Sequence, residues 1–375
     1  MKIWVIGRGY PTPENKMWGS FELEQAKMLA RNGHDVSFIA LTLSFFSRKD
    51  HRGIRSFVED FVNIHTYSHF YFPGKLGAYL ESFEDKCWRR VLKVAEKESG
   101  IPDIIHIHYP SMISSINEIE KYRERGVKIV VTEHWSRVLI NNLKKHELAR
   151  LNYYSTHANC FLSVSRLLLD AARILTEITV PTEIVPNIVS PVFFKETVSK
   201  NNDNSTFICI GRLVPLKQFD IVIREFLKEF NGNEKIRLKI IGAGSERKKL
   251  EQIADGSPQI EFKGELSLEN TAKELANADA LISFSKYETF AAPVAEAWAC
   301  GKPVIVSKES GVADYVNIEN GLIVPGKDPA ALRKAQKELF ERKNEYNSDS
   351  IRGFAETNFN DVIVMKKLNK IYEDC

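Results

Sequence analysis

The sequence predicts an α/β protein with two domains, each built as a parallel sheet with helices on both faces. The chain has 375 residues, more than one core of ordinary size holds. Apolar segments of strand length alternate with helical segments, an order typical of parallel sheets. The alternation starts again after a polar stretch at Thr197–Ser205, and we place the linker just before or within this stretch. We therefore expect a first domain over residues 1–190 and a second over residues 191–355.

The first domain begins with a strand, a turn and a helix. Ile3–Ile6 is apolar and ends in a glycine-rich turn, a helical pattern covers about Phe21–Asn32, and Val36–Leu41 is the next apolar strand. The same alternation continues to the end of the domain. Further strands are expected at Val62–Thr66, Ile104–His108, Lys128–Thr132, Cys160–Val164 and Thr182–Val185, and helices at about Leu80–Ser99, Ser114–Glu124, Leu143–Tyr154 and Ser165–Leu175.

The second domain repeats this construction. Its first strand is Thr206–Ile210, and its second, Leu238–Ile241, ends in another glycine-rich turn. A helical pattern at Val362–Tyr372 follows the last strand of the domain. The remaining strands are expected at Ile260–Phe262, Ala280–Ser283, Pro303–Ser307 and Gly321–Val324.

Composition and charge exclude several classes of protein. With 43% hydrophobic and 27% charged residues, the chain is typical of soluble globular proteins, and a net charge of +3 gives no strong attraction to nucleic acid. No apolar stretch approaches the roughly 18 residues of a membrane-spanning helix, and no signal-peptide pattern opens the sequence. The five cysteines are odd in number and never spaced Cys-x-x-Cys. We therefore expect a cytoplasmic protein without disulfides or a zinc site.

Two glycine turns resemble the start of a dinucleotide-binding fingerprint, but neither completes it. They are Gly7–Gly9 and Gly242–Gly244, each directly after a strand. The third glycine of the fingerprint is replaced by Thr12 in the first turn and by Arg247 in the second. A plain tight turn is the simpler interpretation of both, and a NAD-dependent dehydrogenase is disfavoured.

The segment Glu288–Ile305 carries the strongest functional signal. Pro293 suits the first turn of a helix, so a helix should begin at about Ala292 and end at Gly301. The backbone amides of residues 290–292 would then face the carboxyl edge of the sheet. Open α/β sheets bind ligands at that edge, and a helix N-terminus there favours phosphate.

Two carboxylates flank this expected helix start. Glu288 precedes the helix and Glu296 lies about one turn into it. Carboxylates beside an anion site suit the hydroxyl groups of a sugar or a ribose, because they accept hydrogen bonds from them. The alternative is a capping carboxylate and a solvated helical glutamate.

A basic cluster follows the first strand of the second domain. The segment Gly211–Lys217 contains Arg212 and Lys217, two cations beside a glycine turn at the same carboxyl edge. Together they could neutralise a diphosphate. The alternative is that both cations are ordinary surface charges. This alternative is less favoured, because the basic pair and the acidic pair, Glu288 and Glu296, would face the same site.

These segments resemble a known family. Glu288–Ile305 is similar to the Glu-x7-Glu signature of the retaining, GT-B-fold glycosyltransferases of glycosyltransferase family 4, and Gly211–Leu213 with Lys217 resembles its basic donor-phosphate motif. The likeness covers nearly the whole chain. Further resemblances are Trp18–Ala26 to the family's first glycine loop and helix, His106–His108 to its strand facing the cleft, Val185–Asn187 to its domain crossover and Ile241–Gly244 to its middle glycine turn.

The resemblance implies a GT-B fold, in which two Rossmann-like, doubly wound domains face a central cleft and the last helix, from about residue 356, returns to the first domain. It also implies residue roles. The candidate catalytic residues are Glu288, which would bind hydroxyls of the transferred sugar, and His134, which would contact the same sugar. The other residues expected to bind the donor are Arg212, Lys217, Glu296, Phe290, Ala291, Ala292 and Gly19.

Within that set, the resemblance assigns the diphosphate to Arg212 and Lys217, and the ribose to Glu296. Gly19 would lie in the loop near the reacting groups, and the amides of residues 290–292 would complete the phosphate and sugar contacts. Two positions depart from the family pattern: Thr289–Ala291 lacks the glycine or serine frequent around the phenylalanine, and Gln218 replaces the usual glycine after the lysine. These departures bear on donor preference more than on activity.

His134 and the other histidines have simpler interpretations as well. A histidine at a strand end is more often a structural hydrogen-bonding group than a catalytic one. Only the position of His134 at the carboxyl edge of the sheet favours a role for it in the site. His106 and His108 alternate on one strand and therefore point to the same face, so a metal pair is conceivable. Without an Asp-x-Asp motif or a ligand set at metal spacing, we expect no metal and no other cofactor.

The function that the resemblance implies is transfer of a hexose-type sugar, with retention, from a UDP- or GDP-sugar to a hydroxyl of a glycan or a polyprenyl-linked acceptor in surface polysaccharide or glycoconjugate synthesis. The alternatives are a sugar-nucleotide epimerase of the same fold and a non-catalytic partner subunit.

The stretch Phe45–Phe57 mixes aromatic and basic residues. Such a segment could rest on an anionic membrane surface at the inner face of the membrane, although a solvated loop is the more common outcome.

Overall fold

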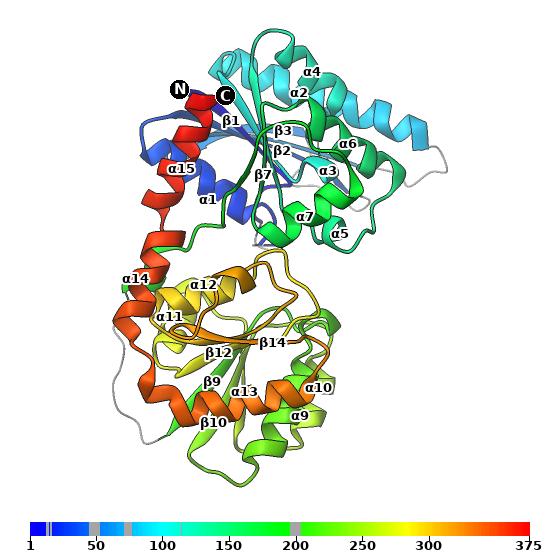
Figure 1. Cartoon of the computed structure of the whole chain (residues 1–375). Coiled ribbons are helices and arrows are strands. Elements are labelled where there is room, and N and C mark those ends of the chain that lie inside the picture. Colours follow the sequence, from blue (N-terminus) through cyan, green and yellow to red (C-terminus); the bar gives the residue numbers. More distant parts are fainter. Residues whose placement is uncertain (13–14, 16, 45–52, 71–76, 114, 196–203) are drawn as a thin grey trace. The chain divides into compact units, whose positions relative to one another are not determined.

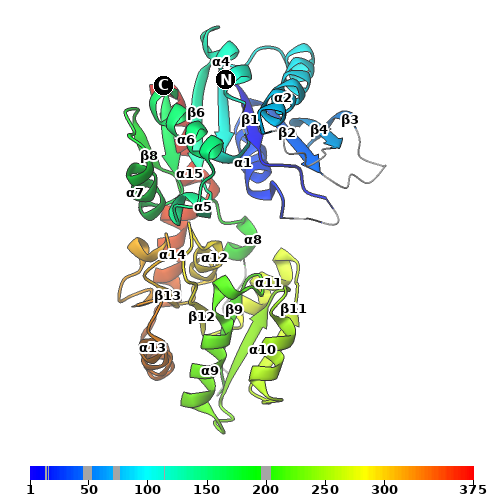
Figure 2. The same ribbon diagram turned by 90° about the vertical axis from the view of Figure 1, so that its right-hand side faces the viewer.

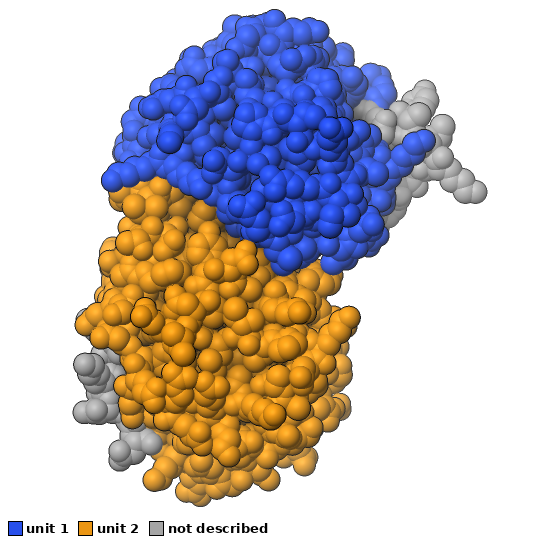
Figure 3. All heavy atoms as spheres, in the orientation of Figure 1, with its two compact units in different colours: residues 1–185, 365–375 blue, residues 186–364 orange. Residues whose placement is uncertain are grey.

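The structure divides into two compact α/β units (Figure 3), one formed by residues 1–185 and 365–375 and the other by residues 186–364. Each unit contains one sheet with helices on both of its faces (Figures 1 and 2), so the predicted fold class is confirmed. The computed structural model describes residues 1–12, 15, 17–44, 53–70, 77–113, 115–195 and 204–375.

The first unit has an eight-stranded sheet in the order β3-β4-β2-β1-β5-β6-β7-β8. Neighbouring strands are parallel except for the β3–β4 pair, which is antiparallel. The sequence does not predict β3, because all of its side chains stay partly or fully exposed at the sheet edge and they form no apolar run. The strands are β1 (Lys2–Gly7), β2 (Asp35–Ser44), β3 (Gly53–Glu59), β4 (Val62–Phe70), β5 (Ile104–His108), β6 (Lys128–Glu133), β7 (Cys160–Ser163) and β8 (Thr182–Ile184).

Helices cover both faces of this sheet. The last helix of the chain, α15, contributes residues 365–374 to the unit, although the strands come from the first 185 residues. The helices are α1 (Ser20–Arg31), α2 (Gly77–Ser99), α3 (Pro110–Ile113), α4 (Ile116–Arg123), α5 (Ser136–Leu139), α6 (Lys145–His157), α7 (Arg166–Leu175) and α15 (Asp361–Asp374).

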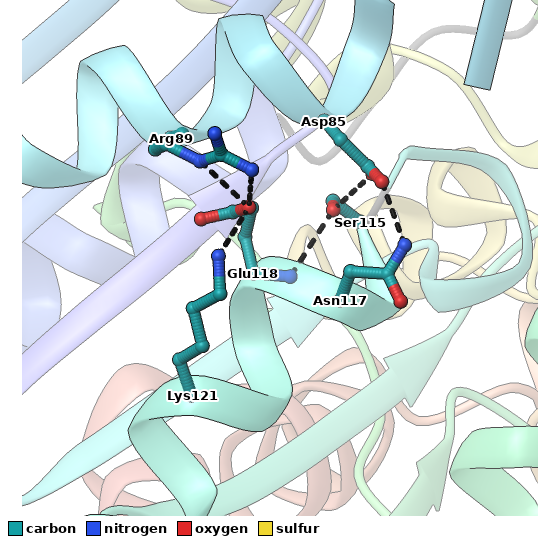
Figure 4. A network of polar contacts seen from close by, with 6 residues as sticks. All are labelled: Asp85, Arg89, Ser115, Asn117, Glu118 and Lys121. Carbon is teal, nitrogen blue, oxygen red and sulfur yellow. Dashed lines mark hydrogen bonds and ion pairs between the residues drawn. The ribbon is translucent and has the colours of Figure 1, made fainter. Parts of the chain in front are cut away.

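Polar contacts join α4 to α2 (Figure 4). The hydroxyl of Ser115 accepts a hydrogen bond from the amide of Glu118 at 3.3 Å, which caps α4, and donates one to the carboxylate of Asp85 on α2. The carboxylate of Glu118 in turn accepts hydrogen bonds from Arg89 of α2 and from Lys121. The start of α4 is thereby tied to α2 at two points.

The second unit has a six-stranded, fully parallel sheet in the order β11-β10-β9-β12-β13-β14. The helices α9, α10 and α13 pack together on one face, and α8, α11, α12 and α14 pack together on the other (Figures 1 and 2). The strands are β9 (Ser205–Ile210), β10 (Ile236–Ile241), β11 (Ile260–Gly264), β12 (Ala280–Ser283), β13 (Val304–Ser307) and β14 (Gly321–Val324). The α-helices are α8 (Pro191–Lys195), α9 (Phe219–Phe230), α10 (Arg247–Ala254), α11 (Leu268–Ala276), α12 (Ala292–Ala299), α13 (Pro329–Arg342) and α14 (Ser348–Phe359).

The unit boundaries differ from the predicted ones. The second unit begins at Pro186, five residues before the expected start, and the chain rejoins the first unit at Met365 rather than near residue 356. The reason is packing: α8 lies against α11 and α12, and α14 lies against α12. Most of the polar stretch in or before which the linker was expected, residues 197–203, lies outside the described residues.

The segment proposed to contact a membrane falls into two parts. Residues 45–52 lie outside the described residues, and Gly53–Phe57 belongs to β3. A surface loop is therefore the wrong expectation for this second part. None of the helices in the described part of the chain combines the length and the apolar character needed to cross a bilayer.

Candidate active site

Two loops meet at one edge of the second unit's sheet. β9 and β12 are adjacent parallel strands, so their carboxyl ends lie at the same edge. After β9 the chain forms the segment Gly211–Val214 and a short 3₁₀ helix, η2 (Pro215–Lys217). After β12 it runs to the start of α12. The amide of Lys286 donates a hydrogen bond to the carbonyl of Leu216 at 2.9 Å, which joins the two loops directly.

Lys217 and Glu288 form the central contact of this edge. The Nζ atom of Lys217 donates a hydrogen bond to Oε1 of Glu288, and the two side chains are only 14% and 15% exposed. The backbone of Glu288 is fixed on both sides, because its amide donates to the carbonyl of Glu309 at 3.1 Å and its carbonyl accepts from the amide of Gly311 at 2.9 Å. Both charged groups predicted from the sequence are therefore held in place together.

The start of α12 is an uncapped helix N-terminus. Ala291 precedes the helix with a φ of 73°, a left-handed conformation that is costly for a residue with a Cβ, and no side chain caps the first turn. Phe290 is buried and packs edge-on against Phe359 at 5.9 Å. The helix begins at Ala292, as predicted, and ends at Ala299. Its first turn provides the partial positive charge that favours an anion.

Glu296 lies on α12, and its carboxylate is partnerless among the residues that the structure describes. Its side chain is partly buried, and within the described part of the chain no hydrogen bond or ion pair reaches its carboxylate. Removal from water raises the pKa of this carboxyl to about 7. A carboxylate in this condition can accept hydrogen bonds from the hydroxyls of a ligand.

Arg212 is exposed at the same edge. Among the described residues none forms an ion pair or a side-chain hydrogen bond with its guanidinium, in contrast to Lys217. The backbone around it is tightly packed: a Cβ atom at Gly242 would lie 1.9 Å from the carbonyl oxygen of Gly211. Gly242 is thus required for close backbone approach, which supports the interpretation of its turn as a structural one.

Gln218, which departs from the family pattern, has a structural role. Its φ of 52° is left-handed, the conformation in which glycine is favoured. Its buried side chain compensates, because Nε2 donates to the carbonyls of Phe284 at 2.9 Å and Gly326 at 3.2 Å. Gln218 therefore ties the end of η2 to the loops that follow β12 and β14, directly beside Lys217.

In the first unit, Gly19 opens α1. Its φ is 79°, and a Cβ atom there would lie 1.9 Å from the carbonyl oxygen of Gly9, so only glycine fits. The turn after β1 also holds Arg8, which the sequence did not single out. Its Nε atom lies 3.3 Å from Oε1 of the fully buried Glu22, and its guanidinium lies 4.6 Å from the ring of Tyr109.

His134 lies between His108 and Tyr109 in a row of four aromatic rings at the carboxyl edge of β5 and β6. Its ring stacks on Tyr109 at 4.8 Å and on His108 at 5.1 Å, and His108 stacks on His106 at 4.5 Å. Burial, the Arg8 charge and His106 lower the pKa of His134 to about 3, so its ring is neutral at physiological pH. The side chain remains partly exposed.

The buried carboxylate of Glu133 holds the loop that carries His134. It accepts hydrogen bonds from the amides of His134 and Trp135, both at 2.9 Å, and from the hydroxyl of Ser111 at 2.6 Å. Burial nevertheless raises the pKa of Glu133. This role of Glu133 cannot be read from the sequence, because a glutamate at a strand end is usually solvated.

The structure therefore distributes the predicted residues over two sites. One edge of the second unit carries Arg212, Lys217, Glu288, Glu296 and residues 290–292, and the first unit carries Gly19 and His134. No group of three or more histidine, cysteine, aspartate or glutamate side chains suited to a metal ion occurs among the described residues. The groups available to a ligand are therefore cationic side chains, backbone amides at a helix start, and carboxylates that can accept hydrogen bonds from hydroxyl groups.

Comparisons with known proteins match these observations. Residues 22–192 match the family model described as Glycosyltransferase Family 4, and residues 193–353 match the one described as Glycosyl transferases group 1. The chain is 24% identical over 306 residues to N-acetyl-alpha-D-glucosaminyl L-malate synthase from Bacillus anthracis. The aligned region covers 78% of this chain and 76% of that protein. It is 27% identical over 248 residues to the GDP-mannose-dependent alpha-(1-6)-phosphatidylinositol dimannoside mannosyltransferase from Mycobacterium tuberculosis. This aligned region covers 62% of this chain and 65% of that protein.

Solved structures share the whole architecture. Sucrose-phosphate synthase from Thermosynechococcus elongatus superposes with a TM-score of 0.76 at 17% identity, over 100% of this chain and 98% of that one. HepE from Anabaena in complex with UDP superposes with a TM-score of 0.75 at 16% identity, over the full length of both chains. At these identities the likeness establishes the fold.

Proposed function

The chain belongs to glycosyltransferase family 4 and has the GT-B fold, and from this membership we propose that it transfers a hexose-type sugar, with retention, from a UDP- or GDP-sugar to a hydroxyl of a glycan or polyprenyl-linked acceptor. One observation carries the proposal: the Lys217–Glu288 contact at the carboxyl edge of β9 and β12. It places a cation suited to phosphate directly beside a carboxylate suited to sugar hydroxyls, which is the pairing that a nucleotide sugar requires.

Related proteins support a nucleotide-sugar donor. HepE was solved with UDP and with UDP-glucose, and the mycobacterial relative is GDP-mannose-dependent by name. Both bases are therefore represented among proteins similar to this chain. We propose a nucleoside-diphosphate sugar as donor and leave UDP and GDP as the two alternatives that the experiment below separates.

The proposed chemistry is cleavage of the sugar–phosphate bond as the nucleoside diphosphate leaves. Lys217 and Arg212 would stabilise the negative charge that develops on the diphosphate, together with the amides at the start of α12. Glu288 would accept hydrogen bonds from hydroxyls of the transferred sugar, and Glu296 from those of the ribose. In this proposal the cations and amides meet the leaving group's need for positive charge, and no metal is required.

Gly19 and His134 are proposed to act from the first unit. Gly19 allows the turn of residues 7–9 to pack directly against the start of α1, which fixes that loop. His134 is neutral and partly exposed, so it can exchange a hydrogen bond with a ligand oxygen. Its contact with the donor sugar is part of the proposal.

The acceptor side of the proposal includes a membrane. The mycobacterial relative named above acts on a phosphatidylinositol dimannoside, which supports a lipid-linked acceptor for this chain too. We propose that the basic segment of residues 45–57 contacts an anionic surface at the inner face of the membrane. Sedimentation with liposomes tests this: binding must increase with the fraction of anionic lipid and fall with salt, and equal binding to neutral liposomes would refute it.

A ligand screen followed by product analysis tests the central proposal. Melting curves are recorded with UDP, GDP, ADP and NAD and with the corresponding nucleotide sugars, since a ligand at about 100 times its Kd stabilises a protein by roughly 2.7 kcal/mol. We expect a selective shift with UDP or GDP that is reduced in Lys217→Ala and retained in Lys334→Ala, a charge-matched exposed lysine on α13. A shift with NAD alone would contradict the proposal.

The nucleotide sugar that binds is then incubated with candidate acceptors. Release of nucleoside diphosphate together with a glycosylated product shows transfer, and the anomeric configuration of the product tests retention. Conversion of the donor into an isomeric nucleotide sugar without transfer would instead identify an epimerase. Binding without either reaction for every acceptor class tried would favour a non-catalytic subunit.

A further inference from the structure

We propose that His108 is a positioning residue: it donates its Nδ1–H to Nε2 of His134 and so makes Nδ1 of His134 a hydrogen-bond donor. The geometry behind this proposal is a single contact. Nδ1 of His108 lies 2.8 Å from Nε2 of His134, a hydrogen-bonding distance. His108 lies on β5 and is only 1% exposed.

A hydrogen bond between these two rings requires that only one of the two facing nitrogens, Nδ1 of His108 or Nε2 of His134, carries a proton. Burial holds the pKa of His108 well below its usual range and lowers that of His134 to about 3, so both rings are neutral and each carries one N–H. Either His108 donates from Nδ1, or His134 donates from Nε2. The choice decides which nitrogen of His134 carries its proton.

The other nitrogen of His108 settles the choice. Its Nε2 is buried and has no hydrogen-bond partner in the described part of the chain. If His108 donates from Nδ1, this buried Nε2 is an unpaired acceptor. If His134 donates instead, Nε2 of His108 carries an unpaired, buried N–H. Orphaned N–H groups are the rarer of the two in protein interiors, which favours donation by His108.

The outward nitrogen of His134 then follows. With Nε2 accepting from His108, the proton of His134 resides on Nδ1. No group described in the structure bonds this nitrogen, and the side chain is partly exposed. His134 therefore offers an N–H to an oxygen atom of a ligand and offers no lone pair for taking up a proton. If the proposed function holds, that oxygen belongs to the sugar donor, and His134 cannot act as the base that deprotonates the acceptor hydroxyl.

His106 provides a matched control. It lies two residues away on the same strand, is equally buried and stacks on His108, but both of its nitrogens bond elsewhere. Nδ1 lies 2.7 Å from the hydroxyl oxygen of Tyr372, and Nε2 lies 2.7 Å from the hydroxyl oxygen of Thr132. Replacing His106 disturbs the stack without removing the contact to His134.

Nitrogen-15 NMR of histidine-labelled protein tests the proposal, because the two neutral tautomers give distinct ring-nitrogen signals. Signals of His134 are assigned from their loss in His134→Gln. We expect the Nδ1–H tautomer in the unmodified protein and in His108→Asn, whose amide can still donate from a similar position. In His108→Leu the preference is lost and the Nε2–H form appears, whereas His106→Leu retains the Nδ1–H form.

An Nε2–H signal for His134 in the unmodified protein, or an unchanged Nδ1–H signal in His108→Leu, overturns the proposal. If His108→Leu does not fold, the spectra of the unmodified protein and His108→Asn still decide. The spectra are recorded without substrate, so a failure of sugar transfer leaves this test intact and an unexpected tautomer leaves the transfer assay intact. Where transfer is measurable, His108→Leu should lower kcat/KM by about tenfold or more, with partial rescue by asparagine.

Discussion

Nζ of Lys217 and Oε1 of Glu288 share a hydrogen bond, so the side chain proposed for the donor's phosphate touches the one proposed for its sugar. The two residues are 71 positions apart in sequence and reach each other because β9 and β12 are neighbours in the sheet. Both side chains are mostly shielded from solvent, so their mutual attraction is less screened than that of a surface ion pair. Each therefore shapes the charge that the other presents to a ligand.

Lys217→Ala is expected to weaken binding of the preferred nucleoside diphosphate by about 10- to 100-fold. A hydrogen bond to a charged group contributes about 1.5–3 kcal/mol, and each 1.4 kcal/mol is a factor of about ten in Kd. Titration calorimetry measures the change. Lys334→Ala, which removes the same charge from an exposed site on α13, should bind the nucleoside diphosphate as tightly as the unmodified protein does. Equal weakening of binding in both variants would show that Lys217 acts only through the overall charge of the protein, and would contradict its proposed contact with the diphosphate.

Glu288→Ala is expected to abolish sugar transfer while binding of the nucleoside diphosphate stays within a few-fold of normal. The reason is that Glu288 is proposed to contact only the transferred sugar, whereas the diphosphate is held by Arg212, Lys217 and amides. Transfer rate and diphosphate affinity are measured on the same preparation. Normal transfer by Glu288→Ala would remove the role proposed for this carboxylate.

Glu296→Gln is expected to stabilise the protein at high pH. Burial raises the pKa of Glu296 from 4.5 to about 7, so the folded protein binds this proton more tightly than the unfolded chain. Stability is therefore lost as the pH rises from about 4.5 through 7. At about 1.36 kcal/mol for each pKa unit, the loss reaches at most about 3 kcal/mol at pH 8, since partial exposure reduces it.

Urea unfolding at two pH values measures this effect. The variant should exceed the unmodified protein in free energy of unfolding at pH 8 and match it at pH 4. A gain of the same size at both pH values would assign the effect to packing. The variant should also bind the nucleotide more weakly, because an amide replaces the carboxylate proposed for the ribose.

Gln218→Ala is expected to destabilise the second unit more than Gln218→Gly. Both changes leave the carbonyls of Phe284 and Gly326 without their donor, at a cost of about 1–3 kcal/mol. Only alanine also bears the strain of a left-handed backbone, about 1–2 kcal/mol. Urea unfolding compares the two variants, and equal losses would show that the backbone at this position is not strained.

Much of the fold follows from local sequence pattern. Buried parallel strands such as β1 and β12 form apolar runs bounded by glycine or polar residues, so their positions are visible in the sequence. The edge strand β3 lacks this signal, because none of its side chains is fully buried. The unit boundaries at Pro186 and Met365 depend on which helices pack together, and local pattern carries no information about that.

The residues of the candidate site that belong to a sequence motif could be predicted. Glu288 and Glu296 stand at a fixed spacing around a helix start, and this spacing can be read directly. Arg8 and Glu133 could not be found in this way, because their importance lies in burial beside other side chains. Gln218 was recognised as a departure, but its compensating hydrogen bonds come from carbonyls that only the folded chain brings near.

The hydrogen bond between Tyr372 and His106 has a consequence for the order of folding. The first unit draws its final segment, residues 365–375, from beyond the entire second unit. During synthesis the ribosome therefore completes the second unit, a continuous stretch, before it delivers the helix that finishes the first. The buried nitrogen of His106 must await its tyrosine, so the half of the protein that is made first is the half that is completed last.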